Sequence, residues 1–295
     1  MIDPLPHAWD FEAIGSPWRI DTPAELTAEH RAAVTARIER FDRDWSRFRE
    51  DSLVSLIARE PGRHRLPDDA PALLDWYREL YEGTGGHVSP LVGRALESLG
   101  YGSDYRLTPA ATPERIPAWS DAISWDGEYL DTVRPVLLDV GAAGKGYLVD
   151  IVGDLLSELG VTTSVVDASG DLRARGDVPM RIALEHPLDP SMAIGVVDLH
   201  PVDGHPGALC ASASNRRAWG AGLHHVLDAI TGRPTSAVIA TWVIADDALY
   251  ADGLATALFF DPAPNLLLRH NVSYVRMFAN GRVESSPSFP GELFT

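Results

Sequence analysis

Apolar residues recur three or four positions apart in several long segments of the chain, which is the spacing of one face of an α-helix. In residues 22–46 this stripe consists of Val34, Ile38, Phe41 and Trp45. Thr22, Pro23 and Glu25 precede it in the order of an N-cap, a first helical residue and a capping-box acid. The first helix is therefore expected to begin at Thr22.

Three further helices are expected, two of them from the same spacing. One covers 71–83 and ends at glycines, and its apolar side consists of Leu73, Tyr77, Leu80 and Tyr81. Another follows Lys145 and is capped by Gly160, and its stripe consists of Leu148, Ile151, Val152, Leu155, Leu156 and Leu159. The last helix is expected within 246–260.

Short runs of β-branched and aromatic residues between turn residues predict strands in the second half of the chain. These runs are 161–170, 180–186, 193–200, 207–212, 237–245 and 273–279. Because no regular helical crossovers join them, the pattern indicates an α+β fold with mixed or antiparallel sheets and helices packed on them. Residues 102–135 hold several prolines and no clear period, so this segment is expected to be irregular. No repeat or linker divides the chain, which is expected to form a single domain over 1–295.

The amino-acid composition argues against several classes of binding partner and of site. The formal net charge is -17, which argues against nucleic acid or an anionic membrane surface, because such partners select basic faces. No apolar run reaches the ~18 residues of a membrane span. The single cysteine, Cys210, excludes an intramolecular disulfide and a cysteine-held metal. Residues 1–15 carry no basic region followed by an apolar run, so a cytoplasmic location is expected.

The glycine-rich stretch DVGAAGKGYLVD (139–150) contains one lysine and precedes a predicted helix. It is not a Walker A loop, because Asp139 stands where the first glycine belongs and Gly146 stands where a serine or threonine belongs. Glycines still let the backbone approach a ligand, and a helix start offers N–H groups to an anion. A tight turn without a ligand explains the stretch equally well.

Three other stretches carry side chains suited to chemistry. Asp252 and Thr256 are four apart and share a helix face, so they can bind Mg²⁺, although such a pair more often forms an exposed, solvated face. His225 with Asp228 can do acid–base work, although a lone histidine is more often structural. Asp171 follows a Ser-Gly turn at a strand end, where it can meet a ligand or simply close the turn.

In their order along the chain, these motifs resemble those of the ApbE family, the FAD:protein FMN transferases. The order is Lys-Gly-Tyr-x-x-Asp, Ser-Gly-Asp, His-x-x-Asp-x-x-Thr-Gly and Ala-Asp-x-x-x-Thr, starting from Lys145. The stretches AIGSPW, WSRFREDSLVSLI and TGGHVSPLVG are similar to further family segments, so the resemblance runs from about residue 11 to 286. It implies a T-fold-like α+β architecture with the flavin site between two lobes.

The resemblance also implies the chemistry. FAD is the substrate and Mg²⁺ the metal, and the FMN part moves onto a threonine or serine hydroxyl of a target flavoprotein while AMP is released. The implied acceptor reads Asp-x-x-Thr/Ser-Gly-Ala/Ser-Thr/Ser. Three alternatives stay open: an FAD diphosphatase in which water replaces the hydroxyl, an FAD-binding protein without turnover, and an interaction protein with a vestigial pocket.

The family's site residues carry over position by position. The implied metal ligands are the side chains of Asp252 and Thr256 and the backbone carbonyl of Ala142. The implied flavin-nucleotide contacts are Ile14, Phe48, His87, Val88, Ser89, Asp139, Lys145 and Leu227. His225 matches the histidine linked to transfer, and Asp171 and Asp228 are the next candidates for a catalytic base. The chain departs from the family's usual residues at Ile14, Ser89, Ser169, Ala213, Ala229 and Ile230.

Overall fold

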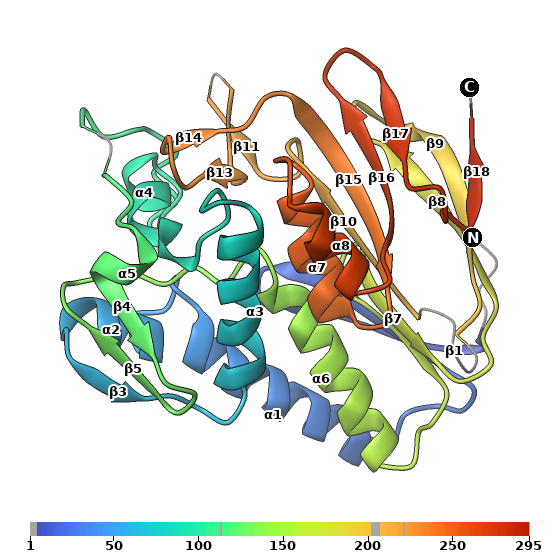
Figure 1. The fold of residues 1–295 in the computed structure, drawn as a ribbon. Coiled ribbons are helices and arrows are strands. Elements are labelled where there is room, and N and C mark those ends of the chain that lie inside the picture. Colours follow the sequence, from blue (N-terminus) through green and yellow to red (C-terminus); the bar gives the residue numbers. More distant parts are fainter. Residues whose placement is uncertain (1–4, 113, 202–206, 221, 295) are drawn as a thin grey trace.

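An antiparallel sheet of eight strands organises the chain (Figure 1). The computed structural model describes residues 5–112, 114–201, 207–220 and 222–294. In spatial order the strands are β1 (His7–Ala13), β2 (Ser16–Thr22), β6 (Ser164–Asp167), β7 (Asp171–Arg175), β10 (Ala208–Ala213), β15 (Val238–Ala245), β16 (Ser273–Phe278) and β17 (Val283–Ser285). Every neighbouring pair is antiparallel, as an α+β fold with antiparallel sheets requires.

Four longer helices gather on one face of this sheet (Figure 1). They are α1 (Ala28–Trp45), α3 (Ala70–Gly83), α6 (Gly144–Glu158) and α7 (Ala248–Ala257). Shorter helices connect them: α2 (Leu53–Arg59), η1 (Pro90–Val92), α4 (Gly93–Ser98), α5 (Trp119–Ala122) and α8 (Pro264–Arg269). The main core lies between these helices and the sheet, and it includes Val166, Cys210 and Val243 from the strands. None of the described helices combines the length and apolarity needed to cross a membrane.

A second, three-stranded sheet covers the opposite face of the large sheet. It consists of β18 (Gly291–Leu293), β9 (Asp189–Leu199) and β8 (Met180–His186), with β9 in the middle. Strand alternation separates the two cores, because Cys210 faces the helices while its neighbour Leu209 packs with Trp242 and Leu184 against the second sheet. Smaller sheets join β3 (Arg63–Arg65), β5 (Tyr129–Thr132) and β4 (Ile123–Trp125), then β11 (Ala218–Trp219) with β12 (Leu223–His224), and β13 (Leu227–Asp228) with β14 (Arg233–Pro234).

The four predicted helices form, but the start of the first was predicted wrongly. The stripe of α1 is buried as expected, yet the helix begins at Ala28 and its N-cap is Thr27, whose side chain accepts the N–H of His30. Thr22 instead ends β2, opposite His7, and donates its hydroxyl to the carbonyl of Ala24 at 2.7 Å. Two threonines offered similar capping chemistry, and pairing with β1 drew the first of them into the sheet.

The six predicted strands are confirmed, and three local predictions are corrected. The irregular segment is wrong in its last part, because 119–132 contains α5, β4 and β5. The strand β5 pairs with both β3 and β4, so tertiary pairing makes strands that local periodicity does not show. Asp171 does not sit in an open turn but begins β7. Leu159 lies just beyond the end of α6 and is 40% exposed, so it is not part of the buried stripe.

Close contact between α6 and α7 fixes the positions of Gly146, Asp150 and Asp252. A Cβ atom at Gly146 would lie 2.2 Å from the carbonyl oxygen of Ala248 and 2.6 Å from Cβ of Asp252, so only glycine fits there. On the next turn of α6, Asp150 accepts the N–H groups of Ala248 and Leu249 at 3.1 and 2.8 Å. This carboxylate satisfies the free N–H groups at the start of α7 and fixes the register of the two helices.

We expect Gly146→Ala to lower the free energy of unfolding by about 1–3 kcal/mol, because the added methyl group forces the two helices apart. The matched control is Gly153→Ala in the same helix, where the nearest atoms to the added one all belong to the flexible Arg175 side chain, with Nε at 2.7 Å. That control should cost little, since alanine gains about 1 kcal/mol of helix propensity over glycine. Urea unfolding of both variants measures the difference, and equal losses would contradict the packing argument.

Candidate active site

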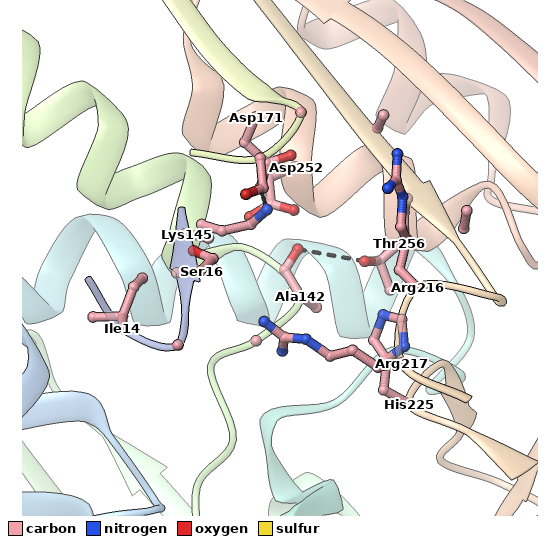
Figure 2. Close-up of a pocket in the computed structure, with 18 of the residues that line it drawn as sticks. Ile14, Ser16, Ala142, Lys145, Asp171, Arg216, Arg217, His225, Asp252 and Thr256 are labelled. Carbon is pink, nitrogen blue, oxygen red and sulfur yellow. Dashed lines mark hydrogen bonds and ion pairs between the residues drawn. The ribbon is translucent and has the colours of Figure 1, made fainter. Parts of the chain in front are cut away.

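One large cavity of about 1210 Å³ lies where the strand ends of the main sheet meet the glycine-rich turn (Figure 2). Its lining includes Lys145 and Asp252 on the helical side and Leu209 and Trp242 on the side of the second sheet. The cavity therefore extends past the ends of the strands to both faces. Of the residues proposed from the sequence, all line this cavity except His87 and Asp228. Its volume exceeds the ~300–1,000 Å³ usual for one small-molecule site.

Three oxygen groups converge where α7 meets the glycine-rich turn. The Thr256 hydroxyl lies 3.5 Å from the Ala142 carbonyl oxygen, and Asp252 lies one turn earlier on α7 (Figure 2). The prediction of an exposed, solvated pair is wrong for Asp252, which is only 6% exposed. Burial, and then the nearby Asp171 carboxylate, raise the pKa of Asp252 well above its usual range.

This donor set fits a hard divalent cation. Carboxylate, hydroxyl and carbonyl oxygens are the ligands that Mg²⁺ accepts, and water or phosphate oxygens complete its shell. The cation would also supply the positive charge that keeps a buried Asp252 ionised. No cluster of three or more His, Cys, Asp or Glu side chains suited to a metal occurs in the described part of the chain, so a site rich in such ligands is not the alternative there.

The glycine-rich turn offers the cavity a carbonyl group rather than a row of N–H groups. Its N–H groups are used internally: Gly141 donates to Asp139, Ala142 to the Tyr77 hydroxyl, Gly144 to the Val140 carbonyl, and Gly146 to Asp252. The general expectation of a helix start that cradles an anion with free N–H groups therefore does not hold for these four. Charge for an anion must come from side chains instead.

Lys145 is the first such side chain. Its Nζ lies 2.8 Å from Oδ2 of Asp171 and donates to the Ala168 carbonyl, also at 2.8 Å. Burial lowers the pKa of Lys145, but the carboxylates of Asp171 and Asp252 outweigh it, so the net pKa lies above the ordinary value and the side chain is charged. Asp171 is fully buried and engaged with the lysine, which makes it a positioning group rather than a free base.

Asp139 is held by Arg47, a residue that the sequence reasoning missed. Burial raises the pKa of Asp139, but the adjacent Arg47 guanidinium outweighs burial and brings it below its usual range. Arg47 lies over the rings of Phe48 and Tyr101 at 4.2 and 5.0 Å and donates to the Tyr101 carbonyl. Phe48 also stacks on Tyr105, with ring centroids 5.5 Å apart. These rings form an aromatic wall of the kind that planar ligands stack on.

His225 lines the cavity as a neutral imidazole. Burial is the main cause that lowers its pKa to about 3, and the neighbouring charges of Arg217 and His224 lower it further. Its Nδ1 is buried and has no hydrogen-bond partner among the described residues. The unused nitrogen of a neutral ring can accept a hydrogen bond, and a negatively charged ligand beside it would offset the burial that disfavours the protonated ring. Leu227, two residues on, packs against Phe48 in the same wall.

The structure does not bring Asp228 and His87 into the cavity. Oδ1 of Asp228 lies 2.9 Å from Nδ1 of His87 and accepts the N–H of Ile230 at 2.8 Å, so this carboxylate holds a turn. In this arrangement the Asp228 carboxylate is engaged with His87 and the turn, and it does not line the cavity with His225. Val88 and Ser89, next to His87, do line the cavity, and Ser89 caps η1 by accepting the N–H of Leu91.

Ile14 reaches the cavity from a strained turn. Ile14 and Gly15 form the two-residue connection of the β1–β2 hairpin, with φ angles of 45° and 72°. Glycine adopts such angles freely, but a β-branched residue does so at a cost of roughly 1–3 kcal/mol. Strain of this kind persists where the surroundings fix the conformation, and it places the Ile14 side chain at the cavity wall.

Two consecutive arginines, Arg216 and Arg217, were also missed by the sequence reasoning. They follow β10 and both line the cavity (Figure 2). The available signal was the pair of positive charges directly after a predicted strand in an acidic chain. Nothing in the spacing showed that this loop crosses to the glycine-rich turn, because the two segments are more than 70 residues apart and meet only through tertiary structure.

Comparisons with known proteins agree with this geometry. The model of the ApbE family matches residues 14–272. The FAD:protein FMN transferase of Rhodobacter capsulatus is 29% identical over 84% of this chain, and the chain spans half of that relative's length. The FAD:protein FMN transferase of Escherichia coli K12 is 26% identical over 84% of this chain and is covered over 76% of its own length.

Solved structures show the same fold. The ApbE protein of Thermotoga maritima superposes with a TM-score of 0.82 at 23% identity, covering 97% of this chain and 99% of that one. The flavin transferase ApbE of Vibrio cholerae gives 0.77 at 22% identity, covering 96% and 98%. At these identities the likeness establishes the architecture, and the α+β prediction is confirmed.

His225 should make stability depend on pH with a defined sign. Its folded pKa of about 3 lies below the ~6.5 of an unfolded chain, so the unfolded state takes up the proton first as pH falls. The parent protein should therefore lose stability relative to His225→Gln as pH falls from ~6.5 towards ~3. Urea unfolding between pH 7.5 and 5 measures this, with the exposed His7→Gln as the control. Parallel profiles for parent and His225→Gln would refute the neutral, desolvated histidine.

Proposed function

The chain belongs to the ApbE family, and from this we propose that it transfers the FMN part of FAD to a hydroxyl of a target protein. The observation that carries the proposal is the convergence of Asp252, Thr256 and the Ala142 carbonyl beside Lys145. Oxygen ligands for a divalent cation and a charged lysine in one cavity are the equipment that a diphosphate requires. The relatives named above are FAD:protein FMN transferases, which supports the same activity here.

The reaction is the attack of an alcohol on a diphosphate. The acceptor oxygen forms a bond to the phosphorus of the FMN half, and the bond from that phosphorus to the bridging oxygen breaks. AMP leaves with the electron pair, and the hydroxyl proton passes to a base. In this proposal neutral His225 takes the proton, because its ring is unprotonated at working pH and has an unused nitrogen.

The protein's other groups position the substrate. Asp252, Thr256 and the Ala142 carbonyl would hold Mg²⁺, which when bound neutralises charge on the phosphate oxygens. Lys145, fixed by Asp171, offers a second positive charge at a constant position. The proposed flavin-nucleotide contacts that line the cavity are Ile14, Phe48, Val88, Ser89, Asp139, Lys145 and Leu227. His87 contributes indirectly, through Asp228 and the turn that follows it.

The size of the cavity favours transfer over hydrolysis. A volume of about 1210 Å³ is above the ~300–1,000 Å³ usual for one small-molecule site, and the part between the two sheets is lined by apolar side chains such as Ile182 and Trp242. An acceptor segment has room to enter there, whereas water needs none. We propose a flavoprotein with an Asp-x-x-Thr/Ser-Gly-Ala/Ser-Thr/Ser segment as the acceptor, and a cytoplasmic location, which fractionation of the host tests.

Incubation with FAD and Mg²⁺, with and without a synthetic acceptor peptide of this pattern, separates the candidate functions. Transfer predicts AMP release only with the peptide, together with a peptide mass increased by FMN. AMP without the peptide identifies an FAD diphosphatase, and bound but unchanged FAD identifies a binding protein. We also expect FAD to bind more tightly than FMN, and equal affinities would count against contacts with both halves of the nucleotide.

Asp252→Asn should abolish Mg²⁺-dependent AMP release while FAD still binds in EDTA, because the metal loses its only charged protein ligand. Asparagine is the better test than alanine, since the buried side chain accepts the Gly146 N–H at 2.8 Å and an amide oxygen can replace that bond. The control is Asp167→Asn, which removes a carboxylate from the same cavity without touching the proposed ligands. Product analysis against Mg²⁺ concentration is the measurement, and a normal Mg²⁺ response in Asp252→Asn would exclude the site.

A further inference from the structure

The positive side chains of the cavity differ in whether they already have a negative partner. Those with a carboxylate within 4 Å are Arg19 with Asp21, Arg47 with Asp139, Arg49 with Asp51, Lys145 with Asp171, Arg181 with Asp198, and Arg216 with Glu185. Arg217 is the exception: among the described residues its side chain has no carboxylate partner. The Arg217 side chain is exposed to solvent at the wall of this cavity, so its positive charge is open to an incoming anion.

The adjacent Arg216 differs from Arg217 because it has a carboxylate partner. Arg216 Nη2 lies 2.9 Å from Oε1 of Glu185 on β8, so that guanidinium is held at the side of the second sheet. Figure 2 shows the two side chains diverging, with Arg217 extending toward the glycine-rich turn that carries Ala142. The two arginines are adjacent in the sequence, but only the Arg217 side chain points toward the glycine-rich turn.

The Arg217 guanidinium acts electrostatically on four neighbouring groups. Its charge acts on Asp139 and Asp252, which it favours in the ionised form, but also on Lys145 and His225, whose protonated forms it disfavours. Asp139 and Lys145 are already engaged with Arg47 and Asp171. Arg217 therefore adds positive charge to a cavity that already holds Lys145, and among the described residues no ion pair joins it to a carboxylate.

We propose that Arg217 binds the diphosphate of the flavin nucleotide and faces the charge that develops as the phosphoanhydride bond breaks. A guanidinium presents several N–H donors in one plane and matches phosphate oxygens in two-point contacts. When AMP leaves with the bonding electron pair, its phosphate gains charge, and a cation already in place lowers the energy of that state. The inference rests on the proposed function for the transfer step, whereas the binding of a phosphate does not depend on it.

The internal use of the turn's N–H groups supports this role. In loops that cradle phosphates with the backbone, N–H groups provide the positive potential, but here four of those in the turn donate to protein oxygens. Side chains must then supply that potential. Lys145 extends from α6 to the part of the cavity beside the glycine-rich turn, and Arg217 extends to it from the loop after β10.

The test compares Arg217→Met with Arg216→Met, which removes the same charge from the adjacent, carboxylate-paired arginine. Binding of FAD, FMN and riboflavin is measured by flavin fluorescence in EDTA, so that no turnover occurs. Arg217→Met should weaken FAD and FMN roughly 10- to 100-fold, the range for a lost hydrogen bond to a charged group, and leave riboflavin unchanged because it has no phosphate. Arg216→Met should change FAD binding by less than about 3-fold.

Turnover then separates this inference from the proposed function. In the presence of Mg²⁺ and the acceptor peptide, Arg217→Ala should lose AMP release, and added guanidinium ion or the Arg217→Lys change should restore part of it. A parent protein that binds FAD through Arg217 but releases no AMP would refute the transferase activity and leave the phosphate contact standing.

Three results would overturn the inference. They are FAD affinity unchanged in Arg217→Met, equal weakening of FAD and riboflavin, or equal effects of Arg216→Met and Arg217→Met. Circular dichroism of each variant shows whether it is folded, and Arg217→Gln, which also removes the charge, replaces Arg217→Met in the binding series if that variant is not.

Discussion

The close approach of α6 and α7 is the constraint on which the candidate site depends. Gly146 allows the helices to touch, its N–H fixes one oxygen of Asp252, and Asp150 caps the start of α7. Together these contacts place Asp252 and Thr256 against the Ala142 carbonyl. Because helix packing fixes Asp252 and Thr256 and the turn that carries Ala142 leads directly into α6, the three oxygen groups are arranged before any cation arrives, and little reorganisation is needed on binding.

Ion pairs arrange most of the positively charged side chains that line the cavity. The chain is acidic overall, yet its cavity is lined by several cations, and nearly all of them in the described residues are neutralised by a neighbouring carboxylate. The largely buried pairs, Arg47 with Asp139 and Lys145 with Asp171, hold side chains in place in a partly desolvated space, where an unpaired charge is costly. The consequence is a site in which the free positive potential is concentrated near the glycine-rich turn and is not spread over the surface.

The cavity also gives the two faces of the large sheet different roles. On the helical face, polar groups from α6 and α7 surround the proposed diphosphate position. On the other face, the layer between the two sheets contributes an apolar wall that includes Leu209 and Trp242. The cavity connects the two around the ends of the strands, so two molecules of different character can meet at one reacting centre.

The sequence by itself determined the local elements and the identity of much of the site. Helical spacing located α1, α3 and α6, because burial on one face imposes a spacing that the residues display, and runs of β-branched residues located six strands. The ordered motifs at Lys145, Asp171, His225 and Asp252 indicated the family, since their chemistry is written in short contiguous stretches.

Only the tertiary structure decided which of these residues act together. It placed Asp228 on a turn outside the cavity, buried Asp252, and drew Thr22 into the sheet. It also brought Arg47 to Asp139 and Arg217 to the glycine-rich turn. These outcomes depend on contacts between segments far apart in the chain, and no local spacing records them. A side chain's partner and its burial, and through them its charge, are set by packing, whereas its helix or strand is set largely by its neighbours in sequence.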